Sequence, residues 1–207
     1  CLPALFVTVV AVAQQAVVVP VGAATAEGNN NGGYPWNVGA QGMRQQFVYD
    51  SSNFTLQGVT APVLIQRLRF RPDSSTVTWP GGSWPNVRID MATGTTDYTT
   101  ASSNFAANMG TDAIVAYQGA VTVQGGTGTG VGVVQPWHID IQLTAPFRYD
   151  PAAGDLVLDV QLDGAGWTGS SCQADAVMVP NAFGTSVHSV AGPTATTGVV
   201  GVGYVLV

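Results

Sequence analysis

His138 and Asp140 are two positions apart in segment 137–143, WHIDIQL. Apolar and polar residues alternate there, which is typical of a strand, so both side chains are expected on the same face. Such a pair could transfer protons or bind a metal ion. A zinc site needs at least three protein ligands, however, and the other histidine, His188, lies fifty residues away. The residues therefore favour a polar outer face, with no metal site.

Other arrangements for catalysis are missing from the sequence. No Gly-x-Ser-x-Gly motif occurs. Glu27 is the single glutamate, so a pair of Glu carboxylates for glycoside hydrolysis cannot form. A hydrolase with an Asp/His site, or with an Asp pair such as Asp140 and Asp159, stays as an alternative. We expect a protein that is not an enzyme.

Four tryptophans adjoin Gly or Pro residues and are expected in loops. They are Trp36, Trp79, Trp84 and Trp167. A large flat ring on a turn can stack on a sugar ring or anchor a protein interface. It can equally fold over the end of a β-structure and close its core. These four residues are the candidate binding residues, and both functional readings and the structural one stay open.

Two acidic segments, 50–53 and 150–155, offer oxygen ligands near tight turns, so calcium is a candidate cofactor. Neither segment has the acidic spacing of a known calcium loop. Asp and Asn are also common turn residues, because their side chains bond to the nearby backbone. Ordinary turns are therefore the favoured interpretation, and we expect no cofactor.

Much of the chain alternates with a period of two, which predicts strands with one buried and one solvent-facing side. The clearest segments are 43–49, 63–71, 86–92, 137–143 and 155–163, and weaker candidates are 16–21, 75–79, 113–117, 120–124, 176–180 and 199–206. One or two helical turns capped by Thr96 or Asp97 are expected within 97–108, and another short turn at 181–189.

Rows of like charge are expected on the outer faces of two of these segments. They comprise Arg67, Arg69 and Arg71 on one segment, and Asp155, Asp159 and Asp163 on the other. Opposite charges on neighbouring strands stabilise a sheet by roughly 0.2 to 1 kcal/mol per pair. We therefore expect the arginine row to face a carboxylate row across the sheet. An anion-binding arginine patch is the alternative.

About ten strands with turn-rich connections predict an all-β fold, an antiparallel β-sandwich of jelly-roll-like type with one or two short helical turns. The 26 Gly and 12 Pro are spread along the chain, as turns between short strands require. The Gly-rich segment 125–132 lacks a lysine and a strand-to-helix context, so it predicts a flexible loop and no phosphate site. We expect residues 14–207 to form a single β-sandwich domain.

Residues 1–13 contain an apolar run and end in Ala11-Val12-Ala13. Small residues after such a run match the signal-peptidase pattern, and the run is shorter than the ~20 residues that span a bilayer. We expect the end of a secretory signal and no membrane span. The alternative is an N-terminal strand arm that pairs with a neighbouring subunit, because the β-branched residues here favour extended chain.

Charged residues make up only 9% of the chain, lysine is absent, and the net charge is −6. Phosphate binding needs a dense cationic surface, so we expect no nucleic-acid partner. An acidic membrane surface is disfavoured for the same reason. So weakly charged a surface suits a secreted protein, or one that packs against copies of itself.

Several segments resemble a group of uncharacterised secreted bacterial β-sandwich surface proteins. They are VVVPVGAATAEGNNNGGYPWN, MRQQFVYDSSNF, VLIQRLRFRPD and APFRYDPAAGDLVLDV. The likeness runs over most of residues 17–206. It implies export and an all-β, jelly-roll-like fold, and it brings no established activity and no catalytic residue.

Together these observations favour a non-catalytic secreted or cell-surface structural protein. It would assemble through subunit packing into a layer, fibre or matrix, with copies of itself as partners. The first alternative is a carbohydrate-binding or adhesion module that binds polysaccharide on the loop tryptophans. The second is the hydrolase with an Asp/His site.

Overall fold

The computed structural model describes residues 15–32, 34–75, 78–170 and 173–177, together with the backbone of three strands between 187 and 206. The signal segment or strand arm expected at 1–13 lies outside the described residues. Within the described part of the chain there are fourteen strands, two short α-helices and two 3-10 helices. Every described strand pair is antiparallel, which confirms an antiparallel all-β fold.

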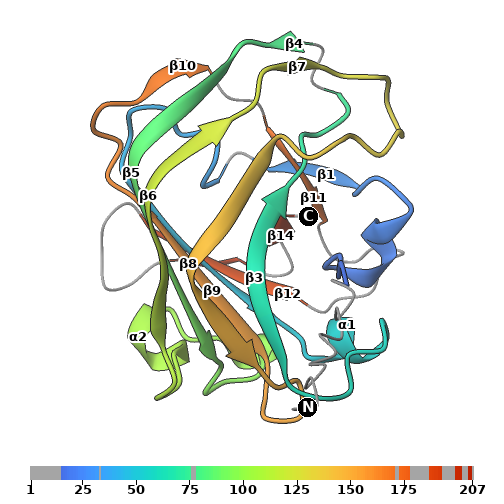
Figure 1. Ribbon diagram of the computed structural model, residues 1–207, viewed down its shortest axis with the longest axis vertical. Helices are drawn as coiled ribbons and strands as arrows, with labels where there is room; N and C mark the ends of the chain where they lie inside the picture. Colours follow the sequence, from blue (N-terminus) through green and yellow to red (C-terminus); the bar gives the residue numbers. More distant parts are fainter. Residues whose placement is uncertain are drawn as a thin grey trace, which may run out of the picture.

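One nine-stranded sheet curls around the core like half of a barrel (Figure 1). Its strand order is β13-β12-β2-β9-β5-β6-β8-β3, and β10 pairs with β5. The bounds are β2 Met43–Tyr49, β3 Val63–Phe70, β5 Gly81–Thr93, β6 Ile114–Val123, β8 Ile139–Tyr149, β9 Leu156–Leu162, β10 Thr168–Ser170, β12 Val187–Gly192 and β13 Val199–Gly201. The five clearest predicted segments are thus confirmed as β2, β3, β5, β8 and β9, while 113–117 and 120–124 join into the single strand β6. The turn expected at 181–189 is wrong where it overlaps β12.

Two smaller sheets complete the fold. The first joins β1 (Asn30–Gly32), β11 (Ala174–Val177) and β14 (Val205–Leu206), and the second joins β4 (Thr78–Trp79) and β7 (Gly126–Thr127). The main hydrophobic core includes Phe47, Ile89 and Leu158 from the large sheet, and Ala174 and Ala176 from β11. Residues far apart in the sequence therefore share one core.

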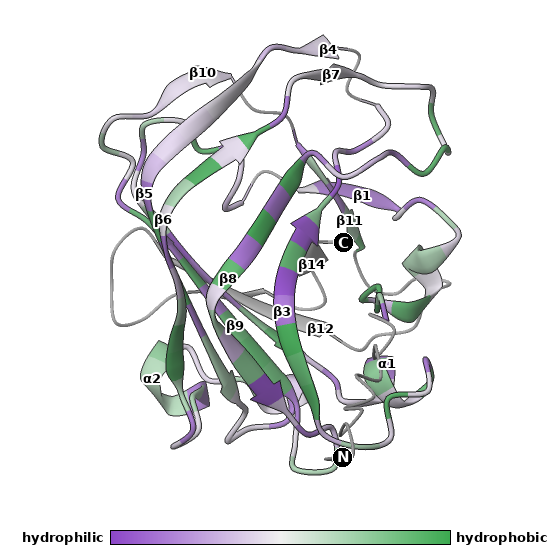
Figure 2. Cartoon of the chain, viewed as in Figure 1, coloured by the Kyte–Doolittle hydropathy of each residue, from purple (hydrophilic) through white to green (hydrophobic). Residues whose placement is uncertain are grey.

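Strand β8 shows the predicted alternation most clearly. Ile139, Ile141 and Leu143 are buried, whereas Asp140 and Gln142 are exposed. Figure 2 shows the same strand as alternating hydrophobic and hydrophilic bands. The period of two therefore predicted the buried face correctly from Ile139 onward, whereas the order is reversed just before the strand, where Trp137 is 38% exposed and His138 is buried.

Strand β9 departs from that pattern, because another segment covers most of its outer face. Asp155 and Asp159 were expected in solvent but are buried, and only Asp163, just beyond the strand, is exposed. The cover is the connection 94–110, which contains η2 (Tyr98–Thr100) and α2 (Phe105–Asn108). A second apolar cluster lies beneath it. Its members are Val48, Ala92 and Val157 from the sheet, with Tyr98, Ala101 and Met109 packed against them.

The helical turns expected in 97–108 are confirmed. The carboxylate of Asp97 accepts a hydrogen bond from the backbone N–H of Thr99 at 2.8 Å, which caps η2 as predicted. The side chain of Asn104 caps α2 in the same way, accepting from the N–H of Ala106 at 3.0 Å. Short polar residues at these positions satisfy N–H groups that have no partner inside the helix.

The three arginines expected in one row have different surroundings in the structure. Arg67 and Arg69 both contact Asp140 on the neighbouring strand β8, each with 3.3 Å between Nε and a carboxylate oxygen. The partner is thus one shared aspartate and not the row on 155–163. Arg71 lies beyond the end of β3, where the chain turns toward β11, and its side chain is buried against Asp175.

The strand expected at 16–21 is wrong. Residues 15–20 form no strand, and Val21–Ala24 is the 3-10 helix η1. The side-chain amide of Gln57 takes the place of a neighbouring strand: it accepts from the N–H of Val18 at 3.0 Å and donates to the Val18 carbonyl at 2.7 Å. Gln57 follows helix α1 (Ser52–Thr55). This segment therefore packs on its own chain through a side chain.

Candidate functional site

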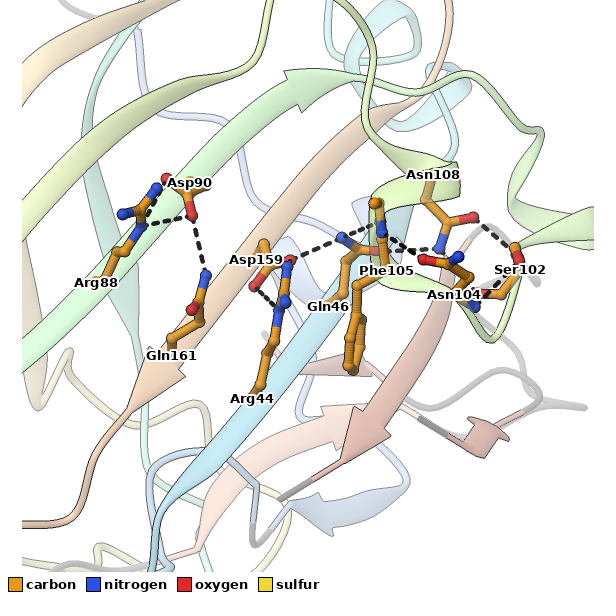
Figure 3. Close-up of polar contacts among 11 residues, drawn as sticks. Arg44, Gln46, Arg88, Asp90, Ser102, Asn104, Phe105, Asn108, Asp159 and Gln161 are labelled. Atoms are coloured by element: carbon orange, nitrogen blue, oxygen red, sulfur yellow. Dashed lines mark hydrogen bonds and ion pairs between the residues drawn. The ribbon is translucent and has the colours of Figure 1, made fainter. Parts of the chain in front are cut away.

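Two polar rows cross the outer face of strands β2, β9 and β5. The first row comprises Arg44, Gln161 and Arg88, and the second, two residues away on each strand, comprises Gln46, Asp159 and Asp90. Antiparallel pairing sets residues of neighbouring strands opposite one another, and a step of two residues returns to the same face. Figure 3 shows the two rows side by side.

Asp159 is the centre of this arrangement. Arg44 donates to it from two nitrogens, with 3.0 Å from Nε to Oδ1 and 2.8 Å from Nη2 to Oδ2, and Gln46 donates to Oδ2 at 2.8 Å. The carboxylate is fully buried, and burial raises its pKa although Arg44 and Gln46 favour the ionised form. A paired fork of this kind fixes the direction of the guanidinium as well as its charge.

Helix α2 covers the buried end of the second row. The guanidinium carbon of Arg44 lies 4.5 Å from the centre of the Phe105 ring, a cation–π contact. Asn108, which is fully buried, donates from Nδ2 to Gln46 Oε1 at 2.7 Å and to the Ser102 carbonyl at 2.9 Å. The network thus connects the sheet to the connection above it (Figure 3).

Asp90 belongs to the exposed end of the same network. Arg88 donates from Nε to Asp90 Oδ2 at 2.8 Å, and Gln161 donates to the same oxygen at 3.0 Å. The hydrogen bond and charge of Asp90 raise the pKa of Arg88. The side chain of Arg88 is 46% exposed, so its remaining guanidinium nitrogens face solvent.

An open groove of about 300 Å³ lies beside these residues and is named here the polar groove. It is lined by Met43, Arg44, Asn86, Arg88, Gln118, Gln161, Leu162 and Asp163. Its volume is at the lower end of the range for small-ligand sites, about 300 to 1,000 Å³. Guanidinium, amide and carboxylate groups together give it both hydrogen-bond donors and acceptors.

The four loop tryptophans lie mostly inside the protein. Trp36, Trp79 and Trp84 are 0%, 6% and 1% exposed, and Trp167 is partly buried against Trp84, with 4.1 Å between ring centres. The exposed tryptophan of the described chain is Trp137, at 38%. The rings of Trp36, Trp79, Trp84 and Trp167 therefore pack over the core. This is the structural one of the interpretations that the sequence allowed.

The structure separates His138 from Asp140. His138 precedes β8 and is 2% exposed, which corrects its expected place on the outer face. Its Nδ1 lies 3.0 Å from the carbonyl oxygen of Phe70, which can only accept, so Nδ1 carries the hydrogen. Asp140 is 46% exposed and pairs with the two arginines of β3. The pair is thus not brought together for proton transfer.

The acidic turns use their carboxylates on the backbone. Asp50 accepts from the N–H of Ser52 at 2.8 Å, and Asp150 accepts from that of Ala152 at 3.1 Å. Asp155 accepts from the N–H groups of Ser51 and Tyr98 at 2.9 and 2.8 Å. Among the residues that the structure describes, no group of three or more His, Cys, Asp or Glu side chains is placed to bind a metal ion.

The polar groove was not identified from the sequence, and Asp163 was named only as part of a charged row, although one signal for the groove exists. Arg44 and Gln46 alternate with Gln45 and Phe47 in β2, so a shared face was readable. The neighbours across the sheet were not, because register depends on long-range pairing. Glutamines and asparagines also have no distinctive spacing in the sequence.

Comparison with known proteins gives this site no precedent: no protein-family model, no curated protein and no solved structure matches the chain. Within the described residues, none of the helices is both long and apolar enough to cross a bilayer.

Proposed function

We propose that this chain is a non-catalytic structural domain, secreted or displayed at a cell surface, that assembles with copies of itself into a layer, fibre or matrix. The observation that carries the proposal is the connection between β7 and β8, where four apolar side chains face solvent. They are Val131, Val133, Val134 and Trp137, with exposed fractions of 84%, 46%, 38% and 38%. Burial of such a group against a partner is favourable, and clustered exposed apolar residues mark interaction sites.

A second exposed apolar site supports contact between unlike ends of two copies. Leu56, just after α1, is 71% exposed, and Leu64, near the start of β3, is 58% exposed. Figure 1 places α1 near one end of the long axis and β7 near the other. Contact between unlike surfaces of identical chains continues into a fibre when the rotation does not close a ring. We therefore favour head-to-tail assembly.

Composition supports export, since the chain has few charged residues and no lysine. The finer fold within this proposal is a jelly-roll-like sandwich, as in the secreted bacterial surface proteins that the sequence resembles. Support comes from the core that the large sheet shares with β11, as two packed sheets would share it.

The test is the mass of the protein in solution. Size-exclusion chromatography with light scattering should show a mass that rises with concentration, and negative-stain microscopy should show extended assemblies. The triple variant Val131→Ser/Val133→Ser/Val134→Ser should remain monomeric. Val115→Ser is the matched control, because Val115 is 39% exposed on β6, outside both apolar sites. A wild type that stays monomeric at its highest soluble concentration contradicts the proposal.

Mixing two variants tests the head-to-tail geometry. The double variant Leu56→Ser/Leu64→Ser should also be monomeric alone, because it lacks the other half of the contact. Mixed with the triple valine variant, it retains one intact contact per pair of chains. Dimers that do not grow further are then expected, and a mixture that stays monomeric would rule out contact between these two sites.

A further inference from the structure

We propose that the polar groove binds a neutral, hydroxyl-rich ligand, a short stretch of a polysaccharide. The groove is formed by strands β2, β5, β6 and β9, so it is separate from the apolar connection and the leucines to which self-assembly is assigned. The inference therefore goes beyond the structural role. It also moves glycan binding away from the buried loop tryptophans.

Charge selects the class of ligand. The lining contains two cations, Arg44 and Arg88, and one anion, Asp163. Arg44 is already paired with Asp159, and Arg88 with Asp90, so the net charge around the groove is close to zero. An anionic ligand would lie near three carboxylates, one in the lining and two behind it, and a metal ion would contact two guanidinium groups. A neutral polyol meets neither repulsion.

Hydrogen-bonding chemistry points the same way. A sugar hydroxyl is both donor and acceptor, so it matches a lining that mixes amides, guanidinium groups and a carboxylate. Among the described residues, Nη1 of Arg44, both Nη atoms of Arg88 and the side-chain oxygen Oε1 of Gln161 have no protein partner. Met43 and Leu162 also border the groove, but Leu162 is 3% exposed and Met43 packs against the core, so the contacts offered to a ligand are mainly polar.

The lining is held in position before any ligand arrives. Arg44 is fixed by its paired hydrogen bonds to Asp159, and Gln161 by its bond to Asp90. Asn86 donates to Asp163 at 2.7 Å. Side chains that are already ordered lose little conformational entropy on binding, so a shallow groove can still bind measurably.

The experiment is affinity electrophoresis of the whole chain through gels that contain single polysaccharides. The neutral probes are dextran, soluble starch, mannan and arabinoxylan, and the acidic probes are alginate and dextran sulfate. Retention by at least one neutral polysaccharide is expected, with little change when salt is raised. Retention by the acidic polymers alone, abolished by salt, would identify an anion site and overturn the proposal.

Groove variants locate the binding. The side chain of Gln118 is exposed and makes no hydrogen bond among the described residues, so Gln118→Ala tests binding at little structural cost. The double variant Arg88→Ala/Gln118→Ala should weaken retention by about tenfold or more, as expected for losing a charged and a neutral hydrogen bond. Arg69→Ala is the matched control, because it removes a partly exposed, ion-paired arginine from β3, outside the groove. Binding that survives in the groove variants, or no neutral polysaccharide bound at all, contradicts the inference.

The polysaccharide-binding test does not depend on whether the protein self-assembles. Retention is measured on the monomeric triple valine variant as well as on the wild type, so a failure of self-assembly leaves the binding result readable. Gel mobility without polysaccharide corrects for any change of mass.

Discussion

Arg71 and Asp175 are 104 residues apart in the sequence and form a buried ion pair, with 2.6 Å between Nη2 and Oδ2. Their side chains are 2% and 1% exposed. The same guanidinium donates to the carbonyls of Ala23 and Ala26, at 2.9 and 2.7 Å. One arginine thus ties the end of β3 to β11 and to the segment around η1.

Replacing Arg71 with Met should lower the free energy of unfolding by about 3 to 5 kcal/mol, because Asp175 would remain buried without its cation. Arg69→Met on the same edge should cost less than about 1 kcal/mol, since its pair with Asp140 is half exposed. Urea unfolding followed by tryptophan fluorescence measures both. Equal losses in the two variants would contradict the structural role of the buried pair.

The cover over the polar rows depends on Asn108. Asn108→Ala removes four hydrogen bonds, to Gln46, to the Ser102 carbonyl and N–H, and to the Thr96 hydroxyl. We expect a loss of about 1 to 3 kcal/mol, because Gln46 would keep a buried oxygen without a donor. Hydrogen exchange should accelerate in 95–110 before it does in β6. Ala106→Ser, an exposed change in the same helix, is the control.

His138 should contribute a loss of stability in mild acid. Burial lowers its pKa from 6.5 to about 4. Above pH 6.5 the residue is neutral in both the folded and the unfolded chain, so its contribution is complete there. Between pH 6.5 and 4 only the unfolded chain takes up the proton, which costs up to about 3 kcal/mol of stability.

His138→Asn preserves a donor for the Phe70 carbonyl and removes the titration. All other titrating groups are common to both proteins, so the difference between their unfolding free energies isolates His138. Urea unfolding at several pH values from 7 to 4 should show the wild type losing stability relative to the variant as the pH falls. Parallel pH profiles would mean that His138 titrates normally.

Trp84 and Trp137 should respond very differently to truncation. Trp84 is 1% exposed, packs 5.9 Å from Trp36 between ring centres and donates from Nε1 to the Gly39 carbonyl at 3.0 Å. Trp84→Ala should cost about 3 to 5 kcal/mol. Trp137→Ala should cost about 1 kcal/mol, the typical effect of a point mutation. Thermal or urea unfolding compares them, and a larger loss for Trp137 would contradict the burial of Trp84.

Local pattern was enough to find six strands of the large sheet, β2, β3, β5, β6, β8 and β9, although it missed β12. The alternation in 43–49 and 137–143 reports the backbone period, which each segment has on its own, and the Asp97 cap of η2 was equally local. Exposure was predicted less well, since a polar residue on a strand does not reveal whether another part of the chain covers it. Asp159, Arg71 and His138 were all expected in solvent, and all are buried by segments distant in the sequence.

The sequence by itself determined that this chain is made of antiparallel strands, and which of their faces are apolar, because side-chain alternation is a property of each strand alone. Tertiary structure decided which strands are neighbours, and therefore which polar residues meet. Arg44, Gln161 and Arg88 form one row only through the register of β2, β9 and β5. Register is set by the sum of many weak contacts across the sheet, and no single segment encodes it.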